Sequence, residues 1–243
     1  MYPTLELNQL IVVLVATRNP LNIGAAARAM SNFGARELRV VNPYEIAFRE
    51  AKSAVGASHV LGRAEEFPSV ADAVADCRLV VGTTSAGPRT LKHPLRPLVE
   101  GGRIIRRHLA AGRVALLFGS EKVGLSTEHM THCHWLMRVP TREQHRSMNL
   151  AQSVAVCLYE LVRGGTSPGP PAKREKDRIH AEDAERMTQL LLRALAGSGY
   201  VKPATTETTE QKLRRMVRRL ELSAEDGEIW LGMLRQIVWK IDR

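Results

Sequence analysis

The sequence predicts an α/β protein with a parallel sheet, helices on both faces of that sheet and a small all-helical extension at the C-terminus. Short apolar runs alternate with helical patterns up to about residue 163, and this alternation is typical of a parallel sheet covered on both faces. A stretch rich in glycine and proline then ends the alternation, and only helical periodicity follows. We therefore expect a first domain at residues 1–163, a linker at 164–177 and a helical extension at 178–243.

Five strands are expected in the first domain, each a short run of mostly apolar residues. Such runs suit strands that are buried on both faces, and they lie at Leu10–Ala16, Glu37–Val41, Leu79–Gly82, Val114–Phe118 and Leu136–Val139. Apolar residues three or four positions apart indicate helices near Ile23–Phe33, Ser69–Ala75, Arg103–Ala110 and Asn149–Arg163. Asn22 is a suitable N-cap for the first helix, and Gly34 is a suitable residue to end it.

Three further helices are expected in the extension, at about Arg178–Ala196, Glu207–Leu220 and Glu225–Ile241. They follow the stretch GGTSPGPPAKREK, in which glycine and proline disfavour regular structure and indicate a linker. In the middle helix one face is apolar, whereas Lys212, Arg215 and Arg219 share another face. The extension is therefore expected to present a basic surface.

The chain carries an excess of positive charge. Its 243 residues include 35 lysines and arginines against 25 aspartates and glutamates, a net charge of +10. This excess favours RNA or DNA as a partner over a membrane, and a basic surface that only keeps the protein soluble is the alternative. No apolar run approaches the ~20 residues that span a bilayer. Three cysteines without close pairing, Cys77, Cys133 and Cys157, predict reduced thiols and a cytoplasmic location.

Four loops are expected to carry the chemistry, because they follow predicted strands and open α/β sheets bind ligands at the carboxyl ends of their strands. The first, TRNPLNIGAAARAMSNFG, contains Arg28 as the one charged residue of its predicted helix. A solvated helix face explains Arg28 as readily as a function does. The second, VVGTTSAGPRT, supplies hydroxyl and backbone groups at Thr83, Thr84 and Ser85, although turns favour the same residues.

The third loop, LLFGSEKVGLS, and the fourth, VPTREQHRSMNLA, complete this edge of the sheet. Gly119 permits a sharp turn, and Gly124 permits a second close approach of the backbone. The third loop lacks the patterns of a phosphate-binding loop and of a dinucleotide fold, which disfavours nucleoside-triphosphate and NAD enzymes. In the fourth loop, Ser147 to Asn149 open an otherwise apolar helix, and helix capping by Ser147 is the structural alternative to a binding role.

A metal site is not expected, although His129, His132, Cys133 and His134 are crowded within EHMTHCHWL. Neighbouring side chains of an extended segment point to opposite sides, so they cannot all reach one ion. There is also no second ligand cluster at zinc-finger spacing.

The loop motifs, taken in order, resemble those of a known family. They are N-x-G-x-x-x-R-A-x-x-x-F-G, G-T-T-S, F-G-S-E-x-V-G-L-S, V-P and S-M-N-L-A-x-S-V-A-V. This series is similar to the SPOUT class of S-adenosylmethionine-dependent RNA methyltransferases, in particular to the SpoU branch, which methylates ribose 2′-hydroxyls. The resemblance covers residues 8–163, and KLRRMVRRL with the helix after it resembles the C-terminal extension of the TrmJ-type tRNA enzymes.

The resemblance implies a deep C-terminal trefoil knot in the first domain, S-adenosylmethionine bound within that knot, and a homodimer with the active site near the subunit interface. It implies donor binding, largely through backbone groups, by Thr83, Thr84, Ser85, Gly119, Val139, Pro140, Ser147, Met148 and Leu150. It also implies a catalytic centre that contains Arg28, Asn22, Ser147 and Asn149.

The roles at this centre are constrained by side-chain chemistry. A guanidinium group stays charged in proteins, so Arg28 is expected to grip a phosphate and stabilise developing negative charge instead of removing a proton. Asn22 and Ser147 are expected to orient the sugar. Glu121 is expected to anchor the motif loop or to fix an arginine.

The resemblance to the TrmJ-type enzymes implies tRNA as the substrate, methylated on the ribose of pyrimidine 32 in the anticodon loop. Ribosomal RNA is the alternative substrate, and a non-catalytic RNA-binding protein is the alternative function, although the small residues of the donor site favour an enzyme. Related enzymes carry a second arginine where this chain has Ala86-Gly87-Pro88, which weakens the case for RNA contacts in that loop. The residues expected to contact RNA are Arg89, Lys92, Arg142, Lys212, Arg215 and Arg219.

Overall fold

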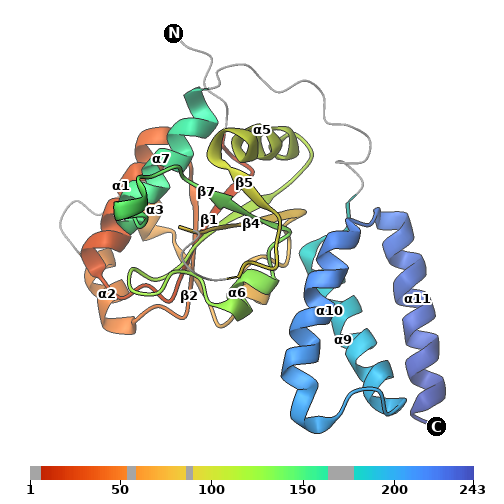
Figure 1. Ribbon diagram of the computed structural model, residues 1–243. Coiled ribbons are helices and arrows are strands. Elements are labelled where there is room, and N and C mark those ends of the chain that lie inside the picture. Colours follow the sequence, from red (N-terminus) through yellow and green to blue (C-terminus); the bar gives the residue numbers. More distant parts are fainter. Residues whose placement is uncertain (1–6, 54–58, 86–89, 164–177) are drawn as a thin grey trace.

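A parallel sheet of seven strands lies at the centre of the first domain (Figure 1). In the computed structural model, which describes residues 7–53, 59–85, 90–163 and 178–243, the strand order is β3-β2-β1-β6-β4-β7-β5 and every pairing is parallel. The α/β class and the parallel sheet are therefore confirmed. The strands are β1 (Leu10–Val15), β2 (Glu37–Val41), β3 (Glu65–Phe67), β4 (Leu79–Thr83), β5 (Leu95–Pro97), β6 (Val114–Phe118) and β7 (Trp135–Arg138).

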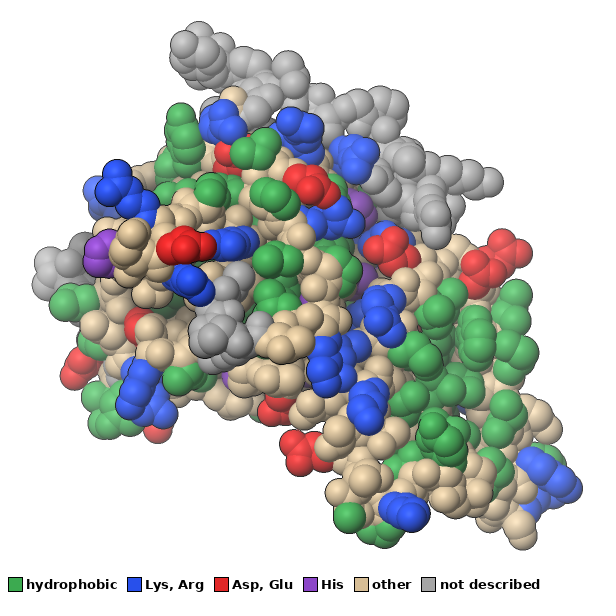
Figure 2. Space-filling view, viewed as in Figure 1, with side chains coloured by type: hydrophobic (Ala, Val, Ile, Leu, Met, Phe, Trp, Pro, Cys, Tyr) green, Lys and Arg blue, Asp and Glu red, His purple; other side chains and the backbone are tan. Residues whose placement is uncertain are grey.

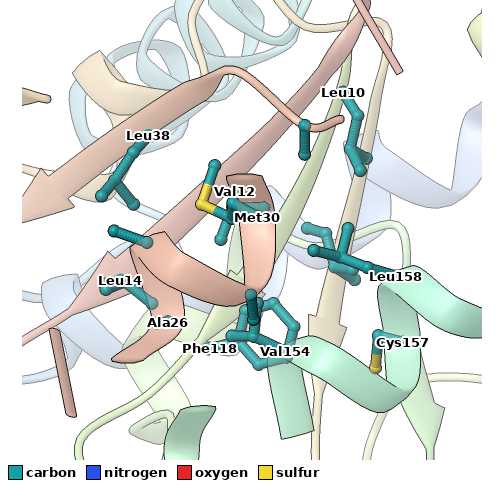
Figure 3. Packing of buried hydrophobic residues seen from close by; sticks show 14 of the residues in the cluster. Leu10, Val12, Leu14, Ala26, Met30, Leu38, Phe118, Val154, Cys157 and Leu158 are labelled. Atoms are coloured by element: carbon teal, nitrogen blue, oxygen red, sulfur yellow. The ribbon is translucent and has the colours of Figure 1, made fainter. Parts of the chain in front are cut away.

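Helices cover both faces of the sheet, which explains why the central strand β1 is continuously apolar. Its residues Leu10, Val12 and Leu14 belong to one core (Figure 3), together with residues of α1 (Pro20–Phe33), α2 (Glu45–Ser53), α3 (His59–Gly62), α5 (Leu98–Leu109) and α7 (Leu150–Arg163). The alternate residues of β1 belong to the opposite core, with residues of α4 (Val70–Ala73), α6 (Thr127–Thr131) and the start of α9 (Ala181–Gly197).

The elements that the sequence does not predict are short. β3 and β5 are edge strands of three residues with polar side chains such as Glu65 and Arg96, so they lack the apolar run that identifies a buried strand. α2, α3 and α6 are also missing from the prediction. α5 begins at Leu98 instead of Arg103, directly after Pro97 in extended conformation.

Capping residues define both ends of α1. The N-cap is Asn19, whose side-chain oxygen accepts a hydrogen bond from the backbone N–H of Leu21 at 2.9 Å. The prediction that Asn22 caps this helix is therefore wrong, because Pro20 already occupies the first helical turn, a position that proline favours. Gly34 ends the helix with a left-handed φ of 77°, as predicted.

The helices predicted for the extension are present as α9, α10 (Thr206–Leu220) and α11 (Ala224–Ile241). They lie side by side next to the sheet domain (Figure 1) and share a core that includes Met187, Val217 and Leu231. The backbone N–H groups of Ala181 and Glu182 donate to carbonyls in the segment between α4 and β4, of Cys77 at 2.8 Å and of Ala75 at 3.0 Å. Two 3₁₀ turns, η1 (Glu143–His145) and η2 (Pro203–Thr205), complete the described elements.

The linker predicted at 164–177 lies outside the described residues. The helices within the described ranges are all too short or too polar to cross a lipid bilayer.

The basic face predicted for α10 is largely buried. Arg214, Arg215 and Arg218 are only 7%, 8% and 2% exposed, because α10 packs against α9 and α6. The expectation that Arg215 belongs to an exposed basic surface is therefore wrong. Lys212 and Arg219 are exposed and remain available to a partner.

A cluster of ion pairs ties β2 to the segment between α4 and β4. Arg39 donates to the two carboxylate oxygens of Asp76 at 2.6 and 2.9 Å, and Arg113 donates to the same carboxylate at 2.5 Å. The hydrogen bonds and charge of Arg39 hold the pKa of Asp76 well below its usual range. The Arg39 side chain is buried, so Asp76 provides its main counter-charge.

Asp76→Asn is expected to lower the free energy of unfolding by about 2–3 kcal/mol at pH 7, because it leaves the buried Arg39 without its main counter-charge. Since the pKa of Asp76 is depressed in the folded protein, this contribution is complete above the ordinary carboxylate pKa and fades as the pH falls below about 4. Urea unfolding at several pH values measures both effects.

The matched control is Glu65→Gln. The carboxylate of Glu65 lies 4.0 Å from the same arginine, but the Glu65 side chain is largely exposed. We expect a change below about 0.5 kcal/mol for this pair. Equal losses in the two variants would contradict the role assigned to Asp76.

Candidate functional site

A cavity of about 390 Å³ opens at the carboxyl ends of β4, β6 and β7. Its volume falls within the usual range for small-molecule sites. The loop after β4, the loop after β6 and the segment between β7 and α7 supply its walls. The lining residues are Thr83, Thr84, Ser85, Phe118, Gly119, Ser120, Glu121, Lys122, Val123, Gly124, Leu125, Met137, Val139, Thr141, Arg146, Ser147, Met148, Leu150 and Ser153.

The structure brings most of the predicted donor-binding residues together around this cavity. Eight of the nine line it, and the exception is Pro140, which is exposed next to Val139. The cavity also has lining residues that sequence reasoning did not select, among them Thr141, Arg146 and Ser153. The position of Arg146 directly before the S-M-N motif is the signal that indicates it.

The loop after β6 folds tightly on itself at Gly119. A Cβ atom on Gly119 would lie 2.0 Å from the carbonyl carbon of Gly124 and 2.1 Å from the nitrogen of Leu125, so no other residue fits without moving backbone. The N–H of Gly124 donates to the carbonyl of Ser120 at 2.8 Å, with Gly124 in the left-handed region at a φ of 68°. This turn presents backbone groups to the cavity in a fixed arrangement.

The hydroxyl loop after β4 is held between its neighbouring strands. Thr83 donates its hydroxyl hydrogen to the carbonyl of Leu117 in β6 at 2.9 Å, and the N–H of Thr84 donates to the carbonyl of Met137 in β7 at 3.0 Å. The cavity is thus framed by backbone and small polar groups on three sides. Such a frame fits a small ligand that carries both polar and apolar groups.

A chain of side-chain hydrogen bonds links the cavity to α1 and α7. Asn149 donates from Nδ2 to Oδ1 of Asn22 at 2.8 Å, and Asn22 donates from Nδ2 to Glu121 at 3.1 Å. The same carboxylate accepts the backbone N–H groups of Arg18 and Asn19, both at 3.3 Å. Glu121 therefore anchors its loop to the start of α1, one of the two roles expected for it.

Asn149 acts as the cap of α7. Its Oδ1 accepts from the backbone N–H of Ala151 at 2.9 Å and of Gln152 at 3.4 Å, which leaves its amide nitrogen to face Asn22. Capping by Ser147 is therefore wrong, because α7 begins at Leu150. Ser147 is instead exposed at the cavity wall.

Arg28 lies apart from the cavity in the described chain. It is exposed and is not among the lining residues. It follows Asn22 by six positions, which places the two side chains about 120° apart around α1. It shares its side of the helix with Leu21, seven residues earlier, which is 80% exposed.

The remaining predicted residues are placed as follows. Of the residues expected to contact RNA, Lys92, Arg142, Lys212 and Arg219 are exposed, whereas Arg89 lies outside the described residues.

The crowded histidines of EHMTHCHWL have separate structural surroundings. His129 completes the capping box of α6 with Ser126, and His134 accepts the backbone N–H of Val80 at 3.1 Å.

Comparison with known proteins places this geometry in a family. The model of the SpoU rRNA Methylase family matches residues 9–159. The tRNA (cytidine/uridine-2′-O-)-methyltransferase TrmJ of Sodalis glossinidius is 36% identical over 235 residues, which are 95% of this chain and 92% of that protein. The corresponding protein of Pectobacterium atrosepticum is 34% identical and covers 95% of this chain and 97% of its own.

Solved structures agree with this assignment. The crystal structure of TrmJ from Z. mobilis ZM4 superposes with a TM-score of 0.80 at 31% identity, covering 93% of this chain and 98% of that chain. AviRb from Streptomyces viridochromogenes in complex with AdoMet shares the fold, with a TM-score of 0.51 at 24% identity over 67% of this chain and 60% of that chain. Because the family model and the relatives both span most of the sheet domain, the chain belongs to the SpoU rRNA Methylase family.

Proposed function

We propose that this chain transfers the methyl group of S-adenosylmethionine to a ribose 2′-hydroxyl of tRNA, at pyrimidine 32 of the anticodon loop. The observation that carries the proposal is the cavity at the strand ends, in which eight predicted donor-binding residues lie beside the linked Asn22 and Asn149. The family is S-adenosylmethionine-dependent, and the relatives that match nearly the whole chain are named as tRNA enzymes.

The donor would bind in the cavity behind Gly119. The residues present fit such a group, because the tight turn at Gly119 and the small residues after β4 leave backbone groups and space on the same side. Val139, Met148 and Leu150 supply apolar surface from the segment that leads into α7. S-adenosylmethionine supplies a methyl group that its sulfonium already activates.

The task of the protein is then to hold the ribose hydroxyl in line with that methyl group. Holding two reactants at attack distance contributes about 7–11 kcal/mol to barrier reduction in well-oriented systems. Asn22 and Asn149 are fixed by the bonds that continue to Glu121, and Ser147 presents its hydroxyl at the cavity wall. These groups would orient the sugar.

Arg28 would complete the site from the partner subunit of a homodimer. It is exposed on the side of α1 that also carries the exposed Leu21, a combination suited to a subunit interface. Its guanidinium stays charged, so its role would be to grip a phosphate and stabilise developing negative charge. This arrangement accounts for a catalytic arginine that lies outside the cavity of its own chain.

RNA would be held by exposed basic residues of both domains, Lys92 and Arg142 in the first, Lys212 and Arg219 in the extension. We also infer the deep trefoil knot of the family. The position of β7 between β4 and β5 supports it, as does the shared cavity of the loop after β6 and the segment before α7. A cytoplasmic location follows from the tRNA substrate.

Gly119→Ala is expected to abolish binding of S-adenosylmethionine, because the added methyl group would displace the backbone of Gly124. Isothermal titration calorimetry with the purified protein measures this. Gly24→Ala is the control, since a Cβ there meets nothing within 4 Å and alanine suits a helix interior. Donor binding by Gly119→Ala at the affinity of the unmodified protein would contradict the assigned pocket.

Arg28→Ala is expected to leave donor affinity within about twofold while methyl transfer to tRNA falls at least ~100-fold, because transition-state contacts act only on the chemical step. Titration calorimetry and transfer of labelled methyl groups measure the two quantities. Full activity of this variant would reject the assigned role.

Mixing the subunits tests where Arg28 acts. A heterodimer of Arg28→Ala and Gly119→Ala subunits has one intact site if the arginine acts on the partner, and none if it acts within its own chain. With random pairing, about a quarter of normal activity should return. A mixture as inactive as its parents would place Arg28 in its own subunit's site.

The double variant Lys212→Gln/Arg219→Gln is expected to weaken tRNA binding. The slope of log affinity against log salt concentration should become less steep by up to about 1.5, because binding releases fewer counterions when phosphate contacts are lost. Fluorescence anisotropy at several salt concentrations measures the slope. Arg235→Gln on α11 removes an exposed charge elsewhere and serves as the control. An unchanged slope in the double variant would exclude these two residues from RNA binding.

A further inference from the structure

An exposed apolar stripe runs along α11, the last helix of the extension. Its members are Ile229, Trp230, Met233 and Ile237, with exposed fractions of 56%, 38%, 47% and 47%. Because they are spaced three or four residues apart, their side chains lie on one side of the helix. Figure 2 shows hydrophobic side chains gathered over the part of the extension where α11 lies. Contiguous exposed apolar patches on a protein commonly mark interaction sites.

This stripe is distinct from the face through which α11 joins its own bundle. The buried residues of the helix are Gly227, Leu231, Leu234 and Val238. Two of them, Leu231 and Leu234, belong to the core that α11 shares with α9 and α10. At about 100° per residue, the centre of the stripe lies roughly 120° around the helix from this buried face. The helix therefore has two apolar faces, and packing within the extension buries only one of them.

Opposite charges mark the two ends of the stripe. Asp226 lies at the N-terminal end and Lys240 at the C-terminal end, and both are exposed. Asp226 also accepts a hydrogen bond from the hydroxyl of Ser223 at 2.7 Å, which fixes its carboxylate at the start of the helix. The charges of the stripe cancel, whereas a surface that binds RNA or an anionic membrane carries an excess of positive charge. The stripe is therefore better suited to a protein surface.

The pattern of the stripe is symmetric about Met233. Ile229 and Ile237 lie four residues on either side of it, and Asp226 and Lys240 lie seven residues on either side. If two copies of this helix lie antiparallel and cross at Met233, Ile229 of each copy meets Ile237 of the other. In the same arrangement Asp226 of each copy meets Lys240 of the other. A two-fold contact uses the same surface on both subunits and requires this kind of self-complementarity.

We propose that the stripe binds a second copy of this chain, with the two α11 helices antiparallel and Met233 at the two-fold axis. The contact buries the apolar residues of both stripes and places an ion pair at each end. This inference does not depend on the proposed function. The helix α1, which the proposed function places at a subunit interface, lies on the opposite side of the molecule (Figure 1). The two contacts can therefore form together and join dimers into larger assemblies.

Sedimentation velocity of the full chain, from low micromolar to several hundred micromolar concentration, tests the contact. One helix from each subunit makes a small interface compared with the standard size of about 1,600 Å², so we expect a dissociation constant in the micromolar range. The mass of the unmodified protein should rise to at least twice that of Met233→Glu. This substitution should weaken self-association at least ~100-fold, because it places two carboxylates opposite each other across the axis.

Gly232→Glu is the matched control. It adds the same carboxylate next to Met233 but outside the stripe, at a position where a Cβ meets nothing within 4 Å. This variant should self-associate like the unmodified protein. Circular dichroism establishes that both variants keep their helical content.

Cysteine cross-linking tests the antiparallel arrangement. The native cysteines Cys77, Cys133 and Cys157 are buried, so a thiol introduced on the stripe is the one that reacts. A mixture of Ile229→Cys and Ile237→Cys proteins should form disulfides between the two variants. Either variant alone should form few, because identical positions lie apart in the antiparallel pair.

Equal masses of the unmodified protein and Met233→Glu at every concentration would overturn the inference. Disulfides that form within each single-cysteine variant and not in the mixture would also overturn it, because a parallel pair brings identical positions together. If Met233→Glu weakened tRNA binding without changing the mass, the stripe would belong to an RNA contact and the inference would fail. Absence of methyl transfer by the unmodified protein would count against the proposed function and would leave these readouts unchanged.

Discussion

The missing side chain of Gly119 is the constraint on which the rest of the site depends. It allows the loop after β6 to fold back until backbone atoms of Gly124 and Leu125 lie where a Cβ atom would be. The cavity at the strand ends exists because this loop stays compact and leaves room for the segment that leads into α7. The loop after β6 can therefore line the cavity only if position 119 carries no side chain.

The chain of hydrogen bonds through Glu121, Asn22 and Asn149 then joins three elements that are distant in the sequence. Asn22 and Glu121 are separated by 99 positions, and Asn149 and Asn22 by 127. Because Asn149 uses its oxygen to cap α7, the orientation of both amides is determined by the fold. A small change in the loop after β6 would be transmitted through these bonds to the start of both helices.

The sequence allows good prediction wherever burial alone determines the pattern. β1 and β6 are apolar throughout because both of their faces are covered, and the strand-end rule correctly brings Thr83, Gly119 and Ser147 to one cavity. Edge strand β5 is not predictable in this way, since Arg96 and Pro97 carry no apolar signal.

Other errors arise where a residue's partner is remote. Pro20 favours the first helical turn and so makes Asn19 the cap, but the contact of Asn22 with the distant Glu121 cannot be read from local rules. In α10 a run of arginines looks like a solvated basic face. However, Arg214 pairs with Glu185 of α9, and α6 packs against α10. Helical periodicity reveals neither contact.

In the proposed function, the cavity and its neighbouring amides direct a methyl group to one ribose hydroxyl. It is tested most directly by mass-spectrometric mapping of ribose methylation in tRNA after incubation with the full-length protein and isotope-labelled S-adenosylmethionine. We expect a single labelled 2′-O-methyl group, on the pyrimidine at position 32. Label on a base, on ribosomal RNA alone or on no RNA at all would contradict it.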